Sequence, residues 1–313
     1  MIKKFVCTIT LLTVGPLAAT YGSAAEHTRC DQSCLEKIGD EYRAAYVKHD
    51  RSLAPFAAHV RYTENNVVLS FPDGSWDVVT SEVGPALIFS DPATGGIGIY
   101  TAIMMREVPA FLAIRLKVHD GKITEVEHLL STKRQVSGPP TPFGDVHHLM
   151  HDPIISERLT ASERRPRAEL IRIADGYYST LARNDGTLHT VFSPTCHRIE
   201  NGLETAEKGG GCAAQFRLGI YRFNERVRRE PILVDEARGI VMFRGFIDHK
   251  GTLIDYKLTD GTVRKSPFAE PHTWSFIESF KVKNGEIAAV EADFIGSPYY
   301  TRSPWSKDKP CFP

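Results

Sequence analysis

The chain has 313 residues, and its 38 Lys and Arg side chains balance its 38 Asp and Glu side chains. This zero net charge gives no indication of nucleic acid or of an anionic membrane surface as a partner. The hydrophobic fraction of 42% and the charged fraction of 24% are typical of a globular protein, and the length suffices for two domains.

The first 25 residues have the pattern of a secretory signal peptide. MIKK is basic, the following FVCTITLLTVGPLAAT is apolar, and YGSAA ends in small residues that favour cleavage after Ala25. A membrane anchor is the alternative, but Gly15 and Pro16 interrupt the apolar run, and no other stretch is long and apolar enough to cross a bilayer. We therefore predict a secreted or periplasmic protein without membrane contact after cleavage.

Five cysteines would remain after that cleavage, and an oxidising compartment favours disulfides between them. Cys196 and Cys212 flank a Gly-rich loop, and we predict a bridge that closes this loop. Cys30 and Cys34 pair with each other, or one of them pairs with Cys311. Because the spacing fits no zinc pattern well, we expect no metal site.

The predicted elements follow one another in the order of an α+β protein. An amphipathic helix comes first, with apolar residues at Leu35, Ile38, Tyr42 and Tyr46, and strands separated by Gly- and Asp-containing turns follow it. A second helix is expected after SERRP. The strands GIGIYTAI, AFLAIRLKV, GIVMFRGFID and SFIESFKV are rich in β-branched and aromatic residues.

This layout occurs twice in the chain. CLEKIGDEYRAAYVKHDRSLAPFAAHVRYTENN aligns with AELIRIADGYYSTLARNDGTLHTVFSPTCHRIENG, and AIRLKVHDGKITEVEHLL aligns with IESFKVKNGEIAAVEADF. Because the start and the end repeat in the same order, we infer the duplication of a whole domain. The predicted boundaries are 1–25 for the signal peptide, 26–152 for the first domain, 153–165 for a linker and 166–313 for the second domain.

The repeated segments resemble the SnoaL-like, nuclear-transport-factor-2-like superfamily, and more closely a family of secreted tandem proteins. VRYTEN, CHRIENG and the closing FKVKNGEIAAVEA are among the segments that carry this resemblance. It implies two tandem cone-shaped domains, each a curved antiparallel sheet wrapped around N-terminal helices, packed as a pseudo-dimer. It also implies acid–base chemistry without a metal or cofactor on small hydrophobic molecules, as in the dehydratases, isomerases and lyases of this superfamily.

An acid–amide pair, Glu64–Asn65, recurs in the second copy as Glu200–Asn201. Strand alternation turns Glu200 and Asn201 to opposite faces, so one of them can point inward as a functional group. Alternatively the pair is structural, and Asn201 tolerates a left-handed turn before Gly202. The recurrence favours the structural interpretation.

The second domain carries more ionisable strand residues than the first, so we place the candidate active site there. His249 is the candidate general base or acid, and the adjacent Asp248 is expected on the other face of its strand. Arg228 and Arg244 are candidates for stabilising developing negative charge. The candidate substrate-binding residues are Tyr177, Trp274, His272, His197 and Asn201. The alternatives are a turn role for Asp248 and His249, and a core role for the aromatic residues.

Two functions follow from these observations. The first is a secreted cofactor-independent enzyme, a lyase, dehydratase or isomerase, that acts on a small hydrophobic or aromatic molecule in the second domain. The second is a non-catalytic small-molecule-binding or interaction protein of the same fold. In both cases we expect a small-molecule partner, and either a monomer with an internal pseudo-dimer or a homodimer.

Overall fold

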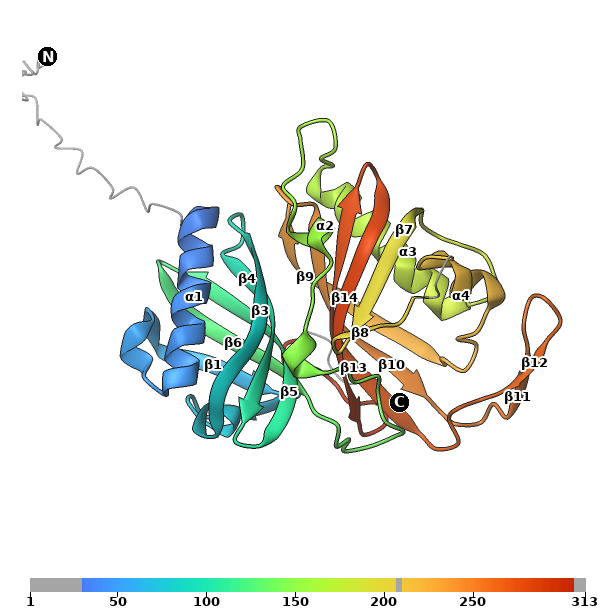
Figure 1. The fold of residues 1–313 in the computed structure, drawn as a ribbon, viewed down its shortest axis with the longest axis horizontal. Coiled ribbons are helices and arrows are strands. Elements are labelled where there is room, and N and C mark those ends of the chain that lie inside the picture. The colour runs from blue at the N-terminus through green and yellow to red at the C-terminus, as the bar shows by residue number, and fades with distance from the viewer. Residues whose placement is uncertain (1–29, 207–209, 307–313) are drawn as a thin grey trace, which may run out of the picture.

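A computed structural model describes residues 30–206 and 210–306, so the predicted signal peptide and Cys311 lie outside the described residues. Within these ranges the chain is α+β, with two six-stranded sheets that each pack against one long helix (Figure 1). We call residues 30–131 the first half and residues 166–306 the second half. The connecting segment contains η3 (Val146–His148) and α2 (Pro153–Ser156).

The first half begins with its long helix and continues as one sheet. Its elements are α1 (Gln32–Lys48), η1 (Arg51–Leu53), β1 (Phe56–Glu64), β2 (Val67–Leu69), η2 (Gly74–Asp77), β3 (Val79–Asp91), β4 (Gly96–Met105), β5 (Val108–His119) and β6 (Lys122–Ser131). The strand order is β2-β1-β6-β5-β4-β3. β1 pairs with β6 in parallel, and the other neighbouring strands are antiparallel.

The second half repeats this topology. Its elements are α3 (Arg167–Arg183), β7 (Phe192–Glu200), β8 (Leu203–Glu204), α4 (Ala213–Leu218), β9 (Arg226–Asp235), β10 (Ile240–His249), β11 (Asp255–Lys257), β12 (Val263–Lys265), β13 (His272–Lys283) and β14 (Glu286–Ser297). The order β8-β7-β14-β13-β10-β9 corresponds to the first sheet strand for strand, and β7 is parallel to β14. α4 takes the place of η2, and a β11–β12 hairpin is inserted between β10 and β13. The repeat in the sequence is thus a repeat of structure.

The helix α1 begins and ends where its sequence indicates. The Asp31 side chain accepts a hydrogen bond from the backbone N–H of Cys34 and caps the first turn. At the other end, His49 adopts a left-handed conformation, and its backbone N–H donates hydrogen bonds to carbonyl groups in the last turn of the helix. The buried stripe that the sequence predicts is present and consists of Leu35, Ile38, Tyr42 and Tyr46.

Each sheet is covered on both faces. The helix face packs against α1 or α3, and the inter-sheet face packs against the other sheet. Because side chains alternate along a strand, Phe243 of β10 belongs to the core around α3, whereas Met242 belongs to the core between the sheets. The layers therefore follow one another as helix, sheet, sheet and helix (Figure 1).

Two reciprocal contacts join the halves. Arg167, in the first turn of α3, donates to both carboxylate oxygens of Asp91 at the end of β3, with N–O distances of 3.0 and 2.6 Å. Gln32, in the first turn of α1, donates to Asp235 at the end of β9 at 2.7 Å. Since β3 and β9 are equivalent strands, each half supplies a helix terminus that holds a strand end of the other half.

Asn65 and Asn201 have the same structural role in the two halves. Both adopt a left-handed conformation, with φ of 49° and 46°. The Asn201 side-chain N–H₂ donates to the Phe294 carbonyl at 3.1 Å, and its oxygen accepts from the Phe294 N–H at 2.9 Å. Asn65 makes the same pair of bonds with Leu130. The turn expected at Asn201 is present, and its amide is occupied by backbone groups. The expectation that Asn201 binds substrate is therefore corrected.

The cysteines pair as the sequence suggests. Cys196 and Cys212 form a disulfide with a Cα–Cα distance of 5.4 Å, and Cys30 and Cys34 form another at 5.3 Å. These pairs are compatible with an oxidising compartment. Of the helices in the described part of the chain, none is long and apolar enough to cross a membrane.

Candidate functional site

The four residues predicted to be catalytic do not form one site. His249 lies on the helix face of the second sheet, whereas Asp248 and Arg244 point to the opposite face, as alternation along β10 requires. The carboxylate of Asp248 accepts from Arg228 at 3.0 and 2.8 Å and from the Thr273 hydroxyl at 2.7 Å. The opposite orientations expected for Asp248 and His249 are thus confirmed, whereas the expectation that Arg228 or Arg244 acts beside His249 is corrected, because the sheet separates them.

Arg244 belongs to a buried ion-pair cluster between the two sheets. Its guanidinium donates to Glu127 of the first half and to Glu230. Arg115 also donates to Glu127, at 2.8 Å. Burial raises the pKa of Glu127, but Arg244 and Arg115 outweigh this effect and hold that pKa below its usual range. Arg244 thus joins the halves and does not face a substrate on the helix face.

His197 lies outside the core of the second half. Its Nδ1 contacts Glu204 at 2.8 Å, and half of its side chain is exposed, 51%. The neighbouring Arg198 takes the opposite direction and is buried. The expectation that His197 binds substrate is corrected by this alternation.

Three predicted residues do converge on the helix face, namely His249, His272 and Trp274. The ring centroids of His249 and His272 are 4.5 Å apart, and Trp274 lies 5.2 Å from His249. Burial, reinforced by the neighbouring His272, lowers the pKa of His249 to about 3. His249 is therefore neutral near pH 7 and a weak base, so we no longer assign it the proton transfer.

Glu278 of β13 is better suited to proton transfer. It lies on the helix face with only 2% of its surface exposed, and its register partner is Phe243. The Tyr178 ring covers this position, with centroids 5.1 to 5.6 Å from the rings of Phe243, Phe276 and Phe280. Burial in this apolar enclosure, reinforced by nearby Glu200, raises the pKa of Glu278 to about 8. Near neutral pH the carboxyl is thus mostly protonated and close to its pKa.

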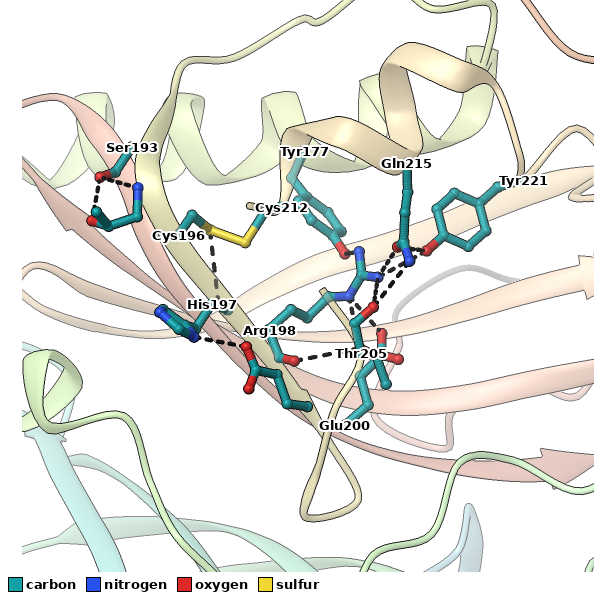
Figure 2. Close-up of a disulfide and its surroundings, with 12 residues drawn as sticks. Tyr177, Ser193, Cys196, His197, Arg198, Glu200, Thr205, Cys212, Gln215 and Tyr221 are labelled. Carbon is teal, nitrogen blue, oxygen red and sulfur yellow. Dashed lines mark hydrogen bonds and ion pairs between the residues drawn. A yellow bond between two sulfur atoms is a disulfide. The ribbon is translucent and has the colours of Figure 1, made fainter. Parts of the chain in front are cut away.

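Two tyrosine hydroxyls accompany this carboxyl. Tyr178 and Tyr177 lie near enough to Glu278 to counteract part of the effect of burial on its pKa. The Tyr178 hydroxyl and Glu278 Oε1 are buried, yet neither has a hydrogen-bond partner of normal geometry in the described part of the protein. The Tyr177 hydroxyl accepts from Arg198 at 3.4 Å (Figure 2). The Tyr178 hydroxyl and the Glu278 carboxyl therefore lie close together without a hydrogen bond of normal geometry between them.

Arg198 is held in place by α4 and the residues beside it, which cover the helix face of the second half. Its guanidinium donates to the Tyr221 hydroxyl at 2.8 Å, to Thr205 at 3.0 and 3.1 Å, and to Gln215 of α4 (Figure 2). The Cys196–Cys212 disulfide ties β7 to the start of the same helix. Glu200 lies 3.2 Å from Arg198 Nε and balances its charge. Thr205, Gln215 and Tyr221 thus fix the guanidinium that donates to Tyr177.

The helix face of the first half contains a different polar network. His128 Nε2 lies 2.7 Å from the Tyr42 hydroxyl, which accepts from Trp76 Nε1 at 3.2 Å. On its other side, His128 Nδ1 lies 3.7 Å from Glu64, whose carboxylate accepts from the Tyr62 hydroxyl at 2.8 Å. Burial raises the pKa of Glu64, but His128, the nearby Ser75 and Tyr62 outweigh it and keep that pKa low. These groups satisfy one another.

Strand register shows how the two networks are related. In the first sheet, the row across β1, β6 and β5 reads Glu64, His128 and Ile114. In the second sheet, the equivalent row across β7, β14 and β13 reads Glu200, Ala292 and Glu278. His128 lies on the strand next to Glu64, whereas Glu278 lies two strands away from Glu200. The methyl group of Ala292 lies between these two carboxyls.

Sequence reasoning overlooked both His128 and Glu278. In KITEVEHLL, His128 alternates with Val126 and Leu130, which are buried against the helix. In HTWSFIESF, Glu278 alternates with Phe276 and Phe280 in the same way. An ionisable residue in phase with apolar core residues was the available signal.

Aromatic rings pack densely on both helix faces. Among the cavities lined by the described residues, two lie elsewhere on the surface. One of about 590 Å³ lies at the junction of the halves beside Asp91 and Asp235, and one of about 440 Å³ lies along the outer side of α3. Among the residues that the structure describes, no group of three or more His, Cys, Asp or Glu side chains is placed to hold a metal ion.

Part of the second half matches a family of unknown activity. Residues 163–294 match a family described as a domain of unknown function, DUF8021. No curated protein matches the chain. Three solved structures are similar to part of it: a candidate ketosteroid isomerase from Kribbella flavida DSM 17836, the candidate hydroxylase AclR from Streptomyces galilaeus, and AusH from Aspergillus nidulans.

These structural similarities are weak. The identities are 12%, 13% and 12%, and the matches cover 40%, 41% and 46% of this chain. They cover 93%, 90% and 99% of the three similar chains, with TM-scores of 0.28, 0.30 and 0.30. The function proposed below therefore rests on the geometry of the second half.

Proposed function

We propose that the second half is a cofactor-independent acid–base enzyme, a lyase, dehydratase or isomerase, with Glu278 as its proton carrier. Its substrate is a small hydrophobic or aromatic molecule. The observation that carries this proposal is the position of the Glu278 carboxyl, which is enclosed by aromatic rings and leaves Oε1 without a partner among the described residues. A substrate takes the place of some of these rings when it binds, and the proton of Glu278 then lies beside it in apolar surroundings.

The chemistry follows from the protonation state of Glu278. In a dehydration, the neutral carboxyl protonates the leaving hydroxyl group, and the carboxylate so formed takes the proton from the neighbouring carbon. Water leaves, and Glu278 returns to its neutral form. The Tyr178 hydroxyl can donate a hydrogen bond to a substrate oxygen on which negative charge develops. The positive charge of Arg198, which donates to the neighbouring Tyr177 hydroxyl, favours negative charge in this region. An isomerisation uses the same two proton transfers without loss of water.

The remaining expectations about the whole chain are part of this proposal. The chain is secreted or periplasmic after cleavage behind Ala25, and its domains span 26–152 and 166–313. The halves pack as an intramolecular pseudo-dimer, which the reciprocal contacts of Arg167 and Gln32 support. The first half then stabilises the second through the inter-sheet face.

A binding protein without turnover is the second candidate. The observation in its favour is that aromatic rings fill both helix faces, with Phe216 of α4 lying 5.0 Å from Tyr177. A ligand must displace such rings in order to enter.

Proton exchange tests the proposal without knowledge of the product. Wild type and Glu278→Gln are incubated in D₂O with a panel of aromatic and polyketide-like hydroxyketones, and deuterium incorporation is followed by NMR. We expect at least one compound to exchange, and the variant to lose about 100-fold or more in rate, because glutamine keeps the shape of the neutral carboxyl but cannot transfer its proton. Glu64→Gln, the matched change in the first half, should keep the wild-type rate. Equal rates for wild type and Glu278→Gln would exclude the assignment.

A further inference from the structure

A cluster of buried polar rings lies where β10 and β13 meet, beyond the residues around Glu278. His249 and His272 are register partners and are both 0% exposed. Trp274 lies beside them, with its ring centroid 5.2 Å from His249 and 6.3 Å from His272. His249 Nδ1, His272 Nε2 and Trp274 Nε1 are buried, and no residue in the described ranges accepts from or donates to them. Each such atom costs about 1–3 kcal/mol when it stays unpaired, so three together require an explanation.

The bonds at the opposite ring atoms determine what each side chain offers. His272 Nδ1 lies 2.9 Å from the carbonyl oxygen of Glu270, which can only accept, so Nδ1 carries the proton of the neutral ring and Nε2 carries a lone pair. His249 Nε2 lies 3.0 Å from the side-chain oxygen of Asn224, which leaves the lone pair on Nδ1. The indole N–H of Trp274 can only donate. The cluster thus offers two acceptors and one donor.

Phe268 occupies the space against all three rings. Its centroid lies 4.3 Å from His249, 4.7 Å from His272 and 5.2 Å from Trp274. A phenyl ring satisfies none of the three polar atoms. Phe268 is not part of a strand, and its N–H bonds the Ser266 hydroxyl in a local turn at 3.2 Å.

Phe268 belongs to an insertion that the first half lacks. In the first half, Met105 and Val108 are register partners at the equivalent strand ends and are joined by a two-residue turn. In the second half, both positions are histidine, and the connection between them carries the β11–β12 hairpin and Phe268. The polar rings and the aromatic side chain that covers them therefore occur together, and only in this half of the described chain.

The geometry points to a binding seat for a neutral aromatic molecule with two adjacent hydroxyl groups, in which Phe268 holds the place of the ligand ring. We call His249, His272, Trp274 and Phe268 the aromatic seat. Two hydroxyls donate to the two histidines, and one of their oxygens accepts from the indole N–H. Phe223, whose centroid is 4.7 Å from Phe268, packs against the edge of the ring. Trp274 and Glu278 are four residues apart on β13, roughly 13 Å, so this binding site is separate from the proposed proton transfer and does not depend on it.

Phe268→Ala tests the seat, because it removes the ring and leaves the polar atoms in place. Binding is measured by calorimetry with three probes of similar size: catechol, 1,2-dimethoxybenzene, which lacks the hydroxyl donors, and toluene. We expect Phe268→Ala to bind catechol at least about ten-fold more tightly than either other probe. His272→Phe in the Phe268→Ala background should remove that preference. Equal affinity for the three probes would show an apolar hole and overturn the proposal, as would a folded Phe268→Ala that binds none of them.

The wild-type protein provides a second measurement that does not depend on the folding of the variant. The indole N–H resonance of Trp274, assigned by its absence in Trp274→Phe, is followed by NMR during titration with catechol. We expect this resonance to move downfield with catechol and to stay in place with 1,2-dimethoxybenzene, since only catechol can displace Phe268 and satisfy both histidines. A resonance that does not respond to millimolar catechol would contradict the proposal.

Discussion

The helix faces of the two halves have the same strand order and the same long helix, yet their polar groups differ in one respect. In the first half, the Tyr42 hydroxyl is paired with His128 at 2.7 Å and with Trp76 at 3.2 Å. In the second half, the Tyr178 hydroxyl and Glu278 Oε1 make no hydrogen bond of normal geometry within residues 30–206 and 210–306, although Tyr178 lies close enough to lower the pKa of Glu278. Duplication has thus kept the packing and changed the polar groups. The first half pairs His128 with Tyr42 and Glu64 with Tyr62, although its Tyr46 hydroxyl also lacks a partner within the described residues, whereas the second half leaves a carboxyl oxygen, Glu278 Oε1, without one. Buried polar groups without partners are the ones that a ligand can satisfy.

The short helices that cover the two helix faces, η2 and α4, also differ in how they contact the equivalent tyrosines. η2 brings Trp76 to 5.6 Å from Tyr42, and α4 brings Phe216 to 5.0 Å from Tyr177, between ring centroids. Trp76 donates a hydrogen bond to its tyrosine, but a phenylalanine cannot, so Tyr177 turns to Arg198 instead. The cover of the second half is also tied down by the Cys196–Cys212 bridge.

The largest expected effect is a pH dependence of opposite sign in the two halves. The pKa of Glu278 is about 8 in the folded protein and 4.5 in its ordinary state, so its contribution to stability is complete below about pH 4.5 and is lost as the pH rises through 8. Relative to Glu278→Gln, the wild type should lose about 1.4 kcal/mol of unfolding free energy per pH unit in that window, several kcal/mol in all. Urea unfolding of both proteins across the window measures the difference.

Glu64→Gln is the matched control for this experiment. Since the folded protein holds the pKa of Glu64 below its ordinary value, the stability that Glu64 adds is present above that value and is lost as the pH falls through the folded pKa. The difference in unfolding free energy between wild type and Glu64→Gln should therefore shrink as the pH falls. For Glu278→Gln, the wild type should instead lose unfolding free energy relative to the variant as the pH rises. Parallel trends for the two variants would contradict the opposite pKa shifts assigned to Glu278 and Glu64.

The sequence predicted the fold more fully than the site, for a physical reason. The internal repeat, the helix stripe with Tyr42 and the left-handed turn at Asn201 all depend on local patterns that one face or one turn imposes. All ten residues of β10 are buried, so alternation there does not reveal which face meets the helix and which meets the other sheet. Alternation along β10 does separate Arg244 from His249, so grouping them was an error of register that the sequence could have excluded.

The disulfides give the next largest expected effect. The cysteines of the second half are 16 residues apart in sequence and those of the first half are 4 apart. In the chain-entropy account, replacing Cys196 and Cys212 by alanine should cost about 3 kcal/mol of unfolding free energy, and replacing Cys30 and Cys34 about 2 kcal/mol. Urea unfolding measures both costs. Mass spectrometry without reductant checks the pairing, and two free thiols at Cys196 and Cys212 would refute it.

The smallest expected effect comes from removing the equivalent tyrosine hydroxyls. Tyr42→Phe leaves His128 Nε2 and the Trp76 N–H without their common partner in a buried network, which should cost about 1–3 kcal/mol. Tyr177→Phe removes a contact with Arg198 that is already long at 3.4 Å, while Tyr221 and Thr205 still bond that guanidinium, so we expect a cost below about 1 kcal/mol. Unfolding of both variants in urea at one pH gives the two values directly. Equal costs would mean that the Tyr177 hydroxyl is paired as firmly as that of Tyr42, and would contradict the difference between the two tyrosines.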